Sequence, residues 1–300
     1  MNIIHWIRAS RPKTLPAAAS PVVAAGALAY HDGVFQIIPA TLCLCFALLI
    51  QIATNFANDA FDFKKGADNA DRVGPRRAVA SGWISFRSML GATFGIIGLA
   101  FMCGLPLIHY GGWPLIAVGL ASAACAILYT AGPFSLAYTG LADGFVMIFF
   151  GWVAVMFTYF LQSGAHSFQA FLLGTSAGAL SMNLLLVNNY RDYATDLKAG
   201  KKTTVVRFGQ KSDRIQYALT LSVAGLASLI LAWSHRNLIL TIPLLALLPG
   251  FAIPKRMKDA REASAHENLL KQTVGILLLW TSLTALALIF STVFGSKPDA

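Results

Sequence analysis

Long uninterrupted stretches of apolar residues dominate this 300-residue sequence and limit the folds that it can adopt. The hydrocarbon core of a bilayer is about 30 Å thick, and roughly 20 apolar helical residues are needed to cross it. Nine stretches approach or exceed that length and predict an all-α polytopic membrane protein with nine transmembrane helices. They are residues 15–30, 34–57, 89–108, 113–129, 141–161, 168–187, 215–233, 238–253 and 269–293.

The composition excludes a water-soluble fold. Only 12% of the residues are charged and 56% are hydrophobic, with a mean hydropathy of +0.63. A typical soluble domain carries roughly 25% charged residues. Half of that proportion leaves too little polar surface to face water, so we expect the lipid bilayer to surround this chain.

The basic residues are distributed very unequally between the loops that join these stretches. Of the 23 Lys and Arg, only Arg236 and Lys297 fall on one side of the expected membrane. The positive-inside rule places the other, basic side in the cytoplasm. We therefore expect one transmembrane domain over residues 1–300, with a cytoplasmic N-terminus and an external C-terminus. Because the net charge of +10 resides in short loops, it indicates topology and not nucleic-acid binding. The expected cytoplasmic loops are 58–88, 130–140, 188–214 and 254–268.

An acidic cluster follows the second apolar stretch. Asn55, Asn58, Asp59 and Asp62 recur at spacings that place them on one face of a helix. Two carboxylates on one helical turn provide the oxygen ligands that Mg²⁺ prefers, together with the phosphates of a substrate. Polar residues at the membrane end of a helix are costly unless they are paired or functional. The cluster is therefore a candidate metal site.

A second cluster follows the sixth apolar stretch, where Asn188, Asp192 and Asp196 are spaced by four residues. Asn55 and Asp59 precede Asn188 and Asp192 by the same 133 residues, and a basic loop follows each cluster. The match is a weak internal repeat, of the kind that a duplicated half of a membrane protein produces. The predicted Mg²⁺ ligands and catalytic residues are Asp59, Asp62, Asp192 and Asp196.

Basic residues beside both clusters complete the pattern of a phosphate site. Lys and Arg neutralise phosphate oxygens, while carboxylates hold the metal. Acidic and basic groups side by side therefore predict a site for a magnesium diphosphate. Some of these cations serve topology alone, and the sequence does not distinguish them. The basic residues are Lys64, Lys65, Arg72, Arg76 and Arg77 after the first cluster, and Lys198, Lys201, Lys202 and Arg207 after the second.

With these motifs the chain resembles the UbiA superfamily of intramembrane prenyltransferases. The family pattern is Asn-Asp-x-x-Asp after one helix and Asp-x-x-x-Asp after another, on a bundle of nine transmembrane helices. This sequence supplies Asn58-Asp59-x-x-Asp62 and Asp192-x-x-x-Asp196. The resemblance covers nearly the whole chain and implies a UbiA-type bundle in a bacterial cytoplasmic (inner) membrane, with the active site facing the cytoplasm.

Within the family the chain is most similar to the branch that prenylates 1,4-dihydroxy-2-naphthoate in menaquinone biosynthesis. The segments that suggest this include 71–77 (Asp-Arg-Val-Gly-Pro-Arg-Arg), 129–133 (Tyr-Thr-Ala-Gly-Pro) and 188–192 (Asn-Asn-Tyr-Arg-Asp). The branch that uses 4-hydroxybenzoate carries Tyr-x-x-x-Lys after the fourth helix, whereas here Tyr129 is followed at that spacing by Pro133. This departure argues against 4-hydroxybenzoate and leaves one diphosphate contact unassigned.

Asp143 is a second departure, because the resemblance leads us to expect Glu at this place in naphthoate enzymes. An acidic residue near a helix N-terminus is also favoured by the helix dipole. Two interpretations of Asp143, as a substrate contact and as a helix-end acid, therefore stay open.

The resemblance implies transfer of the prenyl group of a polyprenyl diphosphate. Mg²⁺ on the four aspartates would neutralise the leaving diphosphate, and the electron-rich naphthalene ring would attack the allylic carbocation. Loss of the ring carboxylate as CO₂ would give demethylmenaquinol. An apolar cavity would keep water away from the cation. The residues expected to bind substrate are Asn55, Asn58, Lys64, Arg72, Arg76, Arg77, Tyr129, Asp143, Asn188, Arg191, Lys198 and Lys202.

Two other functions remain alternatives. One is UbiA-type prenyl transfer to another aromatic acceptor, such as 4-hydroxybenzoate or homogentisate. The other is small-molecule transport, which nine transmembrane segments and a faint repeat would also suit. A transporter is expected to carry polar groups at the membrane midplane, and none of the apolar stretches has a charged residue at its centre. Prenyl transfer is therefore preferred.

Overall fold

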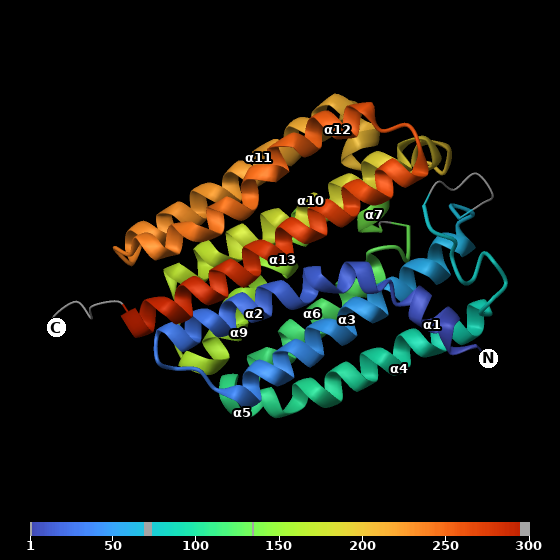
Figure 1. Ribbon diagram of the computed structural model, residues 1–300. Coiled ribbons are helices and arrows are strands. Elements are labelled where there is room, and N and C mark those ends of the chain that lie inside the picture. The colour runs from blue at the N-terminus through green and yellow to red at the C-terminus, as the bar shows by residue number, and fades with distance from the viewer. Residues whose placement is uncertain (1, 69–73, 134, 295–300) are drawn as a thin grey trace.

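The computed structural model describes residues 2–68, 74–133 and 135–294, and the regular structure in this part of the chain is entirely helical (Figure 1). The predicted all-α class is therefore confirmed. In chain order the helices are α1 (Ile3–Ala9), η1 (Pro12–Thr14), α2 (Leu15–His31), α3 (Ile37–Lys64), α4 (Phe86–Gly104), η2 (Leu105–Leu107), α5 (Ile108–Gly111), α6 (Pro114–Leu128), α7 (Leu136–Thr139), α8 (Ala142–Val146), η3 (Met147–Val153), α9 (Ala154–Ser163), α10 (Phe168–Lys198), α11 (Thr204–Ser234), η4 (Leu238–Ala252), α12 (Ile253–Asp259) and α13 (Ala263–Phe294).

Each of the nine predicted apolar stretches coincides with one long helix or with a run of consecutive shorter ones. Seven of these segments, among the residues that the structure describes, are long and apolar enough to cross a membrane. The other two, α2 and α6, have only 17 and 15 residues. The chain is thus a polytopic helical membrane protein, while the count of nine crossings stays a prediction.

α3 and α10 extend beyond the apolar stretches that predict them. α3 continues to Lys64, where the apolar stretch ends at residue 57, and α10 continues to Lys198, past residue 187. The boundaries differ because apolar residues report contact with lipid, whereas a helix continues until its backbone hydrogen bonding is interrupted. The interruption comes at Gly66 and Gly200, whose φ angles of 72° and 71° suit glycine. Both acidic clusters therefore lie on the last turns of long helices.

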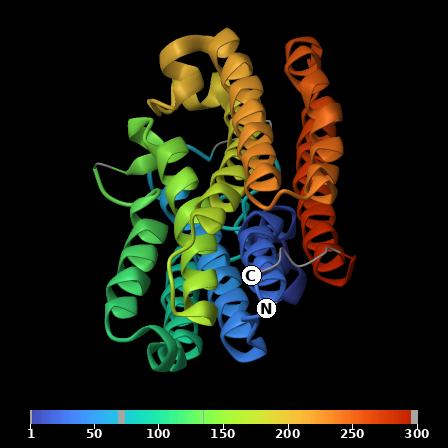
Figure 2. The same cartoon turned by 90° about the vertical axis from the view of Figure 1, so that its left-hand side faces the viewer.

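α10 lies at the centre of the bundle and is the most deeply buried of the long helices. It contacts α2, α9, α11 and α13, while α3 contacts α4, α6 and α9. In Figures 1 and 2 the yellow-to-red segment from α10 to α13 lies to one side of the blue-to-green segment from α3 to α6, and α2 contacts both α3 and α13. Figure 1 also shows α1, α7 and α12 at one end of the bundle, with the last turns of α13 at the opposite end.

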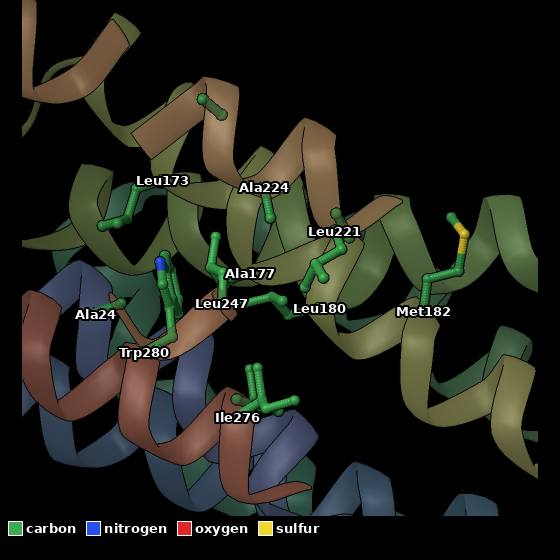
Figure 3. Packing of buried hydrophobic residues seen from close by; sticks show 14 of the residues in the cluster. Ala24, Leu173, Ala177, Leu180, Met182, Leu221, Ala224, Leu247, Ile276 and Trp280 are labelled. Atoms are coloured by element: carbon green, nitrogen blue, oxygen red, sulfur yellow. The ribbon is translucent and has the colours of Figure 1, made fainter. Parts of the chain in front are cut away.

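An apolar core joins α10, α11, η4 and α13, and Figure 3 shows part of it. Trp280 of α13 is fully buried in this core, and its indole Nε1 donates to Ser228 Oγ of α11 at 3.2 Å. Ser176 Oγ of α10 donates to the carbonyl oxygen of Ala224 on α11 at 3.0 Å. Because buried polar groups need such partners, these contacts fix the register of α10 against its neighbours.

η3 and α10 approach each other backbone to backbone. A Cβ atom added to Gly151 would lie 2.6 Å from the carbonyl oxygen of Gly174, and one added to Gly178 would lie 2.9 Å from the carbonyl oxygen of Met147. Small residues permit such close packing of helices in lipid. η3 is a π-helix, a type that occurs mostly as a single turn within α-helices. The contact fixes α8, which directly precedes η3, against α10.

We expect Gly151→Ala to lower the thermal stability of the detergent-solubilised protein, because the added methyl group meets backbone that cannot move aside. Overpacking of this kind costs roughly 1–3 kcal/mol. Gly95→Ala on α4 is the matched control, since a Cβ there has no atom within 4 Å. Because alanine favours a helix more than glycine does, Gly95→Ala should stabilise α4 by roughly 1 kcal/mol. Thermal unfolding checks both variants, and a Gly151→Ala protein as stable as wild type would contradict the close contact.

Candidate active site

A cavity of about 820 Å³ lies within the bundle, and both acidic clusters line it. Asp59, Asp62, Asp192 and Asp196 all belong to its wall. Most of the remaining wall is apolar, so the cavity suits an amphiphile with a charged head and a hydrocarbon tail. The phenylalanine part of the wall consists of Phe46, Phe101, Phe145, Phe149, Phe150 and Phe157.

The same type of helix end places both clusters. The backbone N–H of Ala67 donates to the carbonyl oxygen of Asp62 at 3.0 Å, and that of Lys201 donates to the carbonyl oxygen of Asp196 at 2.9 Å. With a left-handed glycine before the donor, this is the Schellman arrangement of a helix C-terminus. Asp62 and Asp196 therefore occupy equivalent positions on α3 and α10.

Asp62 is 1% exposed, and three side chains donate to its carboxylate. Asn58 Nδ2 lies 3.0 Å from Oδ2, and Tyr138 Oη lies 3.0 Å from Oδ1. Lys201 Nζ lies 3.2 Å from Oδ2. Hydrogen bonds to an ionised group are stronger than neutral ones, so these contacts hold the carboxylate in one orientation.

Lys201 connects the two clusters. Its Nζ lies 3.2 Å from Asp62 Oδ2 and 3.6 Å from Asp196 Oδ1, and the residue is 9% exposed. The ammonium also lies 5.1 Å from the centre of the Tyr138 ring, within the range of a cation–π contact. Carboxylates from α3 and α10 therefore face one point at which a cation is held.

Tyr138 lies between two lysines in the segment after α6. Lys65 Nζ is 4.0 Å from its ring centre and donates to Gly132 O and Ser135 Oγ. Burial and the negative charge of Asp62 raise the pKa of the Tyr138 phenol, so it stays protonated and donates to Asp62. Burial lowers the pKa of Lys65, and the charge of Asp62 opposes this shift.

Asp59 binds backbone that lies far along the chain. Its Oδ2 accepts the N–H of Ala78 at 3.0 Å, and its Oδ1 accepts the N–H of Val79 at 2.9 Å. The two bonds tie the segment that carries Arg76 and Arg77 to α3, and both arginines line the cavity. Each carboxylate oxygen keeps a second lone pair, so ligation of Mg²⁺ by Asp59 stays a prediction.

Arg191 and Asp192 form a bidentate ion pair. Arg191 Nε and Nη2 donate to the two carboxylate oxygens, both at 2.7 Å. A Cβ added to Gly74 would lie 2.9 Å from Arg191 Nη2, so the segment after the first cluster reaches the second cluster. The planar guanidinium fits a carboxylate through two parallel bonds, which fixes the orientation of Asp192.

The N-terminal segment closes another side of the site. Arg11 donates to Asn58 Oδ1, and Asn58 Nδ2 also donates to Thr130 Oγ1 at 2.9 Å. Asn55 Nδ2 donates to the carbonyl oxygen of Ser10 at 2.8 Å. The two asparagines thus hold α3 against the N-terminal segment and the segment after α6.

The UbiA prenyltransferase family model matches residues 18–280. The chain belongs to the UbiA prenyltransferase family. It is 35% identical to the 1,4-dihydroxy-2-naphthoate octaprenyltransferase of Escherichia coli (strain K12), over 95% of both chains. It is 36% identical to the 1,4-dihydroxy-2-naphthoate octaprenyltransferase of Mycobacterium tuberculosis (strain ATCC 25618 / H37Rv), over 96% of this chain and 98% of the relative.

Solved structures of UbiA homologs share the fold of this UbiA family member. A homolog from Archaeoglobus fulgidus bound to GPP and Mg²⁺ superposes with a TM-score of 0.70 at 14% identity, covering 95% of this chain and 99% of the homolog. The apo structure of a homolog from Aeropyrum pernix K1 gives the same TM-score at 13% identity, over 90% and 96% of the two chains. The expected UbiA-type bundle is confirmed.

In this UbiA bundle Asp143 lies in the first turn of α8 and lines the cavity. Its Oδ2 accepts from Thr204 Oγ1 at 2.8 Å and from Gln216 Nε2 at 2.9 Å. Its Oδ1 is buried and has no hydrogen-bond partner in the described part of the chain. A buried acceptor without a donor is costly, so this oxygen is available to a ligand. The helix-end interpretation fits the same position, and both stay open.

A cluster of three or more His, Cys, Asp or Glu able to hold a metal ion is absent from residues 2–68, 74–133 and 135–294. Asp62 and Asp196 nevertheless converge on the ammonium of Lys201, which stands where a metal cation would be attracted. Mg²⁺ is commonly held by one or two carboxylates together with substrate phosphates. The acidic groups of this UbiA site therefore fit an Mg²⁺ ion that is bound together with a diphosphate.

The cavity of this UbiA family member brings together most of the predicted substrate-binding residues. Three predicted lysines are exposed and do not line it, so their roles stay predictions, and Arg72 lies outside the described residues. The predicted residues that line the cavity are Asn55, Asn58, Arg76, Arg77, Tyr129, Asp143, Asn188 and Arg191. The three that do not are Lys64, Lys198 and Lys202.

The sequence prediction named Lys201 of this UbiA chain only among the basic residues after the second cluster, and it did not select Tyr138 or Arg11 for the site. A signal for Lys201 exists, because the glycine before it reverses the chain and returns the next residue to the helix end. No local signal marks Tyr138, since its contact with Asp62 depends on how the segment after α6 folds. Arg11 likewise reaches Asn58 only through tertiary structure.

We expect Lys201→Gln to lower kcat/KM for a prenyl diphosphate on the order of 100-fold. The reason is that the diphosphate end of the cavity loses a preorganised cation, and removal of one such group costs about 10²–10³-fold in kcat. Lys211→Gln is the matched control, since Lys211 is exposed and does not line the cavity, and its effect should stay within about twofold. Steady-state kinetics on folded, purified proteins makes the comparison. Equal losses in the two variants would mean that general loop charge, and not the bridge, is required.

Proposed function

We propose that this protein transfers a polyprenyl group from polyprenyl diphosphate to 1,4-dihydroxy-2-naphthoate, with loss of CO₂, to give demethylmenaquinol. The observation that carries the proposal is the junction of two acidic clusters and Lys201 in the wall of one apolar cavity. The names of the relatives from E. coli and M. tuberculosis support the acceptor. The A. fulgidus homolog structures with GPP or DMAPP and Mg²⁺ support the donor and the metal.

Asp59, Asp62, Asp192 and Asp196 would hold Mg²⁺ together with diphosphate oxygens. When bound, Mg²⁺ neutralises charge on the diphosphate and makes it a better leaving group. Asp59 contributes in a second way, because its two backbone bonds position Arg76 and Arg77 beside the same end of the cavity.

Lys201, and whichever of Arg76 and Arg77 does not bind the acceptor, would add the positive charge of the protein itself at this end. As the allylic C–O bond breaks, its electron pair leaves with the diphosphate, so negative charge grows on the oxygens that these cations face. Groups of this kind stabilise the transition state more than the bound substrate. Tyr138 holds Asp62 in place through a neutral hydroxyl and leaves this balance of charge unchanged.

The apolar wall protects the allylic cation. Water is the competing nucleophile. Apolar side chains of the wall, such as Phe149 and Phe157, offer it no hydrogen bonds and so exclude it. Aromatic faces also attract a cation at close range. The prenyl cation therefore persists until the ring carbon attacks it and the new C–C bond forms.

The naphthoate acceptor is an anion and needs a cation of its own. The sequence has no Lys or Arg between Tyr129 and Asp143, so the cation comes from elsewhere in the cavity wall. Arg76, Arg77 and Arg191 line that wall, and a guanidinium can bind both oxygens of a carboxylate. These arginines are the proposed partners of the acceptor carboxylate, with binding of diphosphate as the competing role.

Purified protein with Mg²⁺, a polyprenyl diphosphate and 1,4-dihydroxy-2-naphthoate is expected to form the prenylated, decarboxylated product, detected by its mass. Asp62→Asn is expected to be nearly inactive, because it removes a charge at the junction of the two clusters. Homogentisate and 4-hydroxybenzoate are expected to give no product in the same preparation.

The possible failures of this assay are distinct. Faster turnover of 4-hydroxybenzoate than of the naphthoate would overturn the acceptor assignment and leave prenyl transfer intact. Undiminished turnover in excess chelator would overturn the role of Mg²⁺. Absence of product with every acceptor would overturn aromatic prenyl transfer altogether.

We also propose that residues 1–300 form one domain that crosses a bacterial cytoplasmic (inner) membrane nine times. Seven long helices, the helical α2 and α6 between them and the asymmetry of basic residues support this arrangement. The cavity end carrying the acidic clusters would face the cytoplasm, with the N-terminus on that side and the C-terminus outside.

Cysteine labelling in intact cells checks the orientation. After replacement of Cys43, Cys45, Cys103 and Cys125, a membrane-impermeant thiol reagent is expected to label Arg236→Cys but not Lys202→Cys. Both residues are exposed, so the difference reports the side of the membrane. Both variants should be labelled after cell lysis, which controls for reactivity. Ready labelling of Lys202→Cys in intact cells would reverse the proposed topology.

A further inference from the structure

A second hollow, of about 250 Å³, lies between α10, α11, α12 and α13. A water molecule takes up about 30 Å³ of liquid, so the hollow has room for a group much larger than water. Four basic side chains line it, and no carboxylate does so in the part of the chain that the structure describes. These side chains are Arg191, Arg214, Lys258 and Arg261.

Three of these cations lack an acidic partner. Arg191 pairs with Asp192, whereas no ion pair joins Arg214, Lys258 or Arg261 to any described residue. Asp259, next to Lys258 in the sequence, does not line the hollow. Like charges at one point repel each other, so an anion bound among them would be stabilised by the three cations outside the Arg191–Asp192 pair.

Neutral hydrogen-bonding groups complete the lining. Tyr190 and Tyr193 contribute hydroxyl groups, and His266 contributes an imidazole. His266 is only 9% exposed, and its Nδ1 has no hydrogen-bond partner in the described structure. Guanidinium, ammonium and hydroxyl groups together are the set that recognises phosphate oxygens.

The surroundings of the hollow resemble those of a phospholipid headgroup. Figure 1 shows α12 at the same end of the bundle as α1 and α7. On α11, Arg214 is followed by Ile215, Leu219 and Leu226, which are 50%, 60% and 59% exposed. Their spacing places them on one face of the helix, where they would contact acyl chains. Basic pockets between transmembrane helices at a membrane surface bind anionic headgroups.

We propose that this hollow binds a phosphate group, and that the phosphate is carried by an anionic phospholipid. Free phosphate or diphosphate offers the same chemistry without the acyl chains. The inference goes beyond the proposed prenyl transfer and does not depend on it. Because Arg191 lies in the walls of both the hollow and the larger cavity, an anion bound here would act on Asp192 through a single ion pair.

The test compares two triple variants of the full-length protein. The hollow variant is Arg214→Gln, Lys258→Gln and Arg261→Gln. The matched control is Lys211→Gln, Lys255→Gln and Lys271→Gln, which removes the same charge from α11, α12 and α13 without touching the lining. Delipidated protein is mixed with phosphatidylglycerol, with phosphatidylcholine or with inorganic phosphate. Native mass spectrometry counts bound lipid, and thermal unfolding reports stabilisation.

Wild type and the control are expected to bind phosphatidylglycerol at least about fivefold more than phosphatidylcholine, and the hollow variant is expected to lose this preference. Stabilisation by inorganic phosphate alone, lost in the hollow variant, would retain the phosphate site and assign it to a free anion. Equal phosphatidylglycerol binding by the two triple variants, with no difference in phosphate, would overturn the proposal. If the hollow variant does not fold, the exposed Lys258→Gln alone is compared with Lys255→Gln on the same criteria.

Discussion

The ammonium of Lys201 is the group that allows the two halves of the site to meet. Asp62 and Asp196 lie on different helices and face one point, where two bare carboxylates would repel each other. With an ammonium between them, the same carboxylates attract a common partner. The acidic end of the cavity, where α3 and α10 meet, therefore depends on Lys201 to hold the two carboxylates together.

Other contacts connect the site across the junction. Asp59 on α3 holds the segment that contains Arg76, and Gly74 of that segment leaves room for Arg191 beside Asp192. The segment after the first cluster therefore contacts the second cluster, and Lys201, which follows the second cluster, contacts the first. Because most of these partners are backbone groups or planar guanidinium groups, their geometry is fixed before a substrate arrives, and preorganised charge is the most effective kind in catalysis.

The acidic clusters and the helical class could be predicted because they depend on local spacing. Asp59 and Asp62, or Asp192 and Asp196, share a helix face wherever that helix lies, and long apolar stretches imply lipid. The distinction between Lys201 and Lys202 could not be predicted in this way, since loop charge is equal for both and only the helix end separates them. Tyr138 depends on the fold of a segment with no periodic pattern. The short helices α2 and α6 show a further limit of the sequence prediction. They pack against longer helices, so their own apolar length does not decide whether they cross the membrane.

The two Schellman helix ends differ in the residue that follows the glycine, which is Ala67 after α3 and Lys201 after α10. One ammonium thus serves two carboxylates, so Lys201 alone leaves one of their two negative charges unbalanced. A lysine at both positions would make the point neutral and remove its attraction for a divalent ion, whereas an alanine at both would leave the acids without a counter-ion. Because only one of the two helix ends carries a lysine, the two carboxylates are held together without a ligand and still attract a further cation. The Mg²⁺ of a metal-bound diphosphate would be that cation.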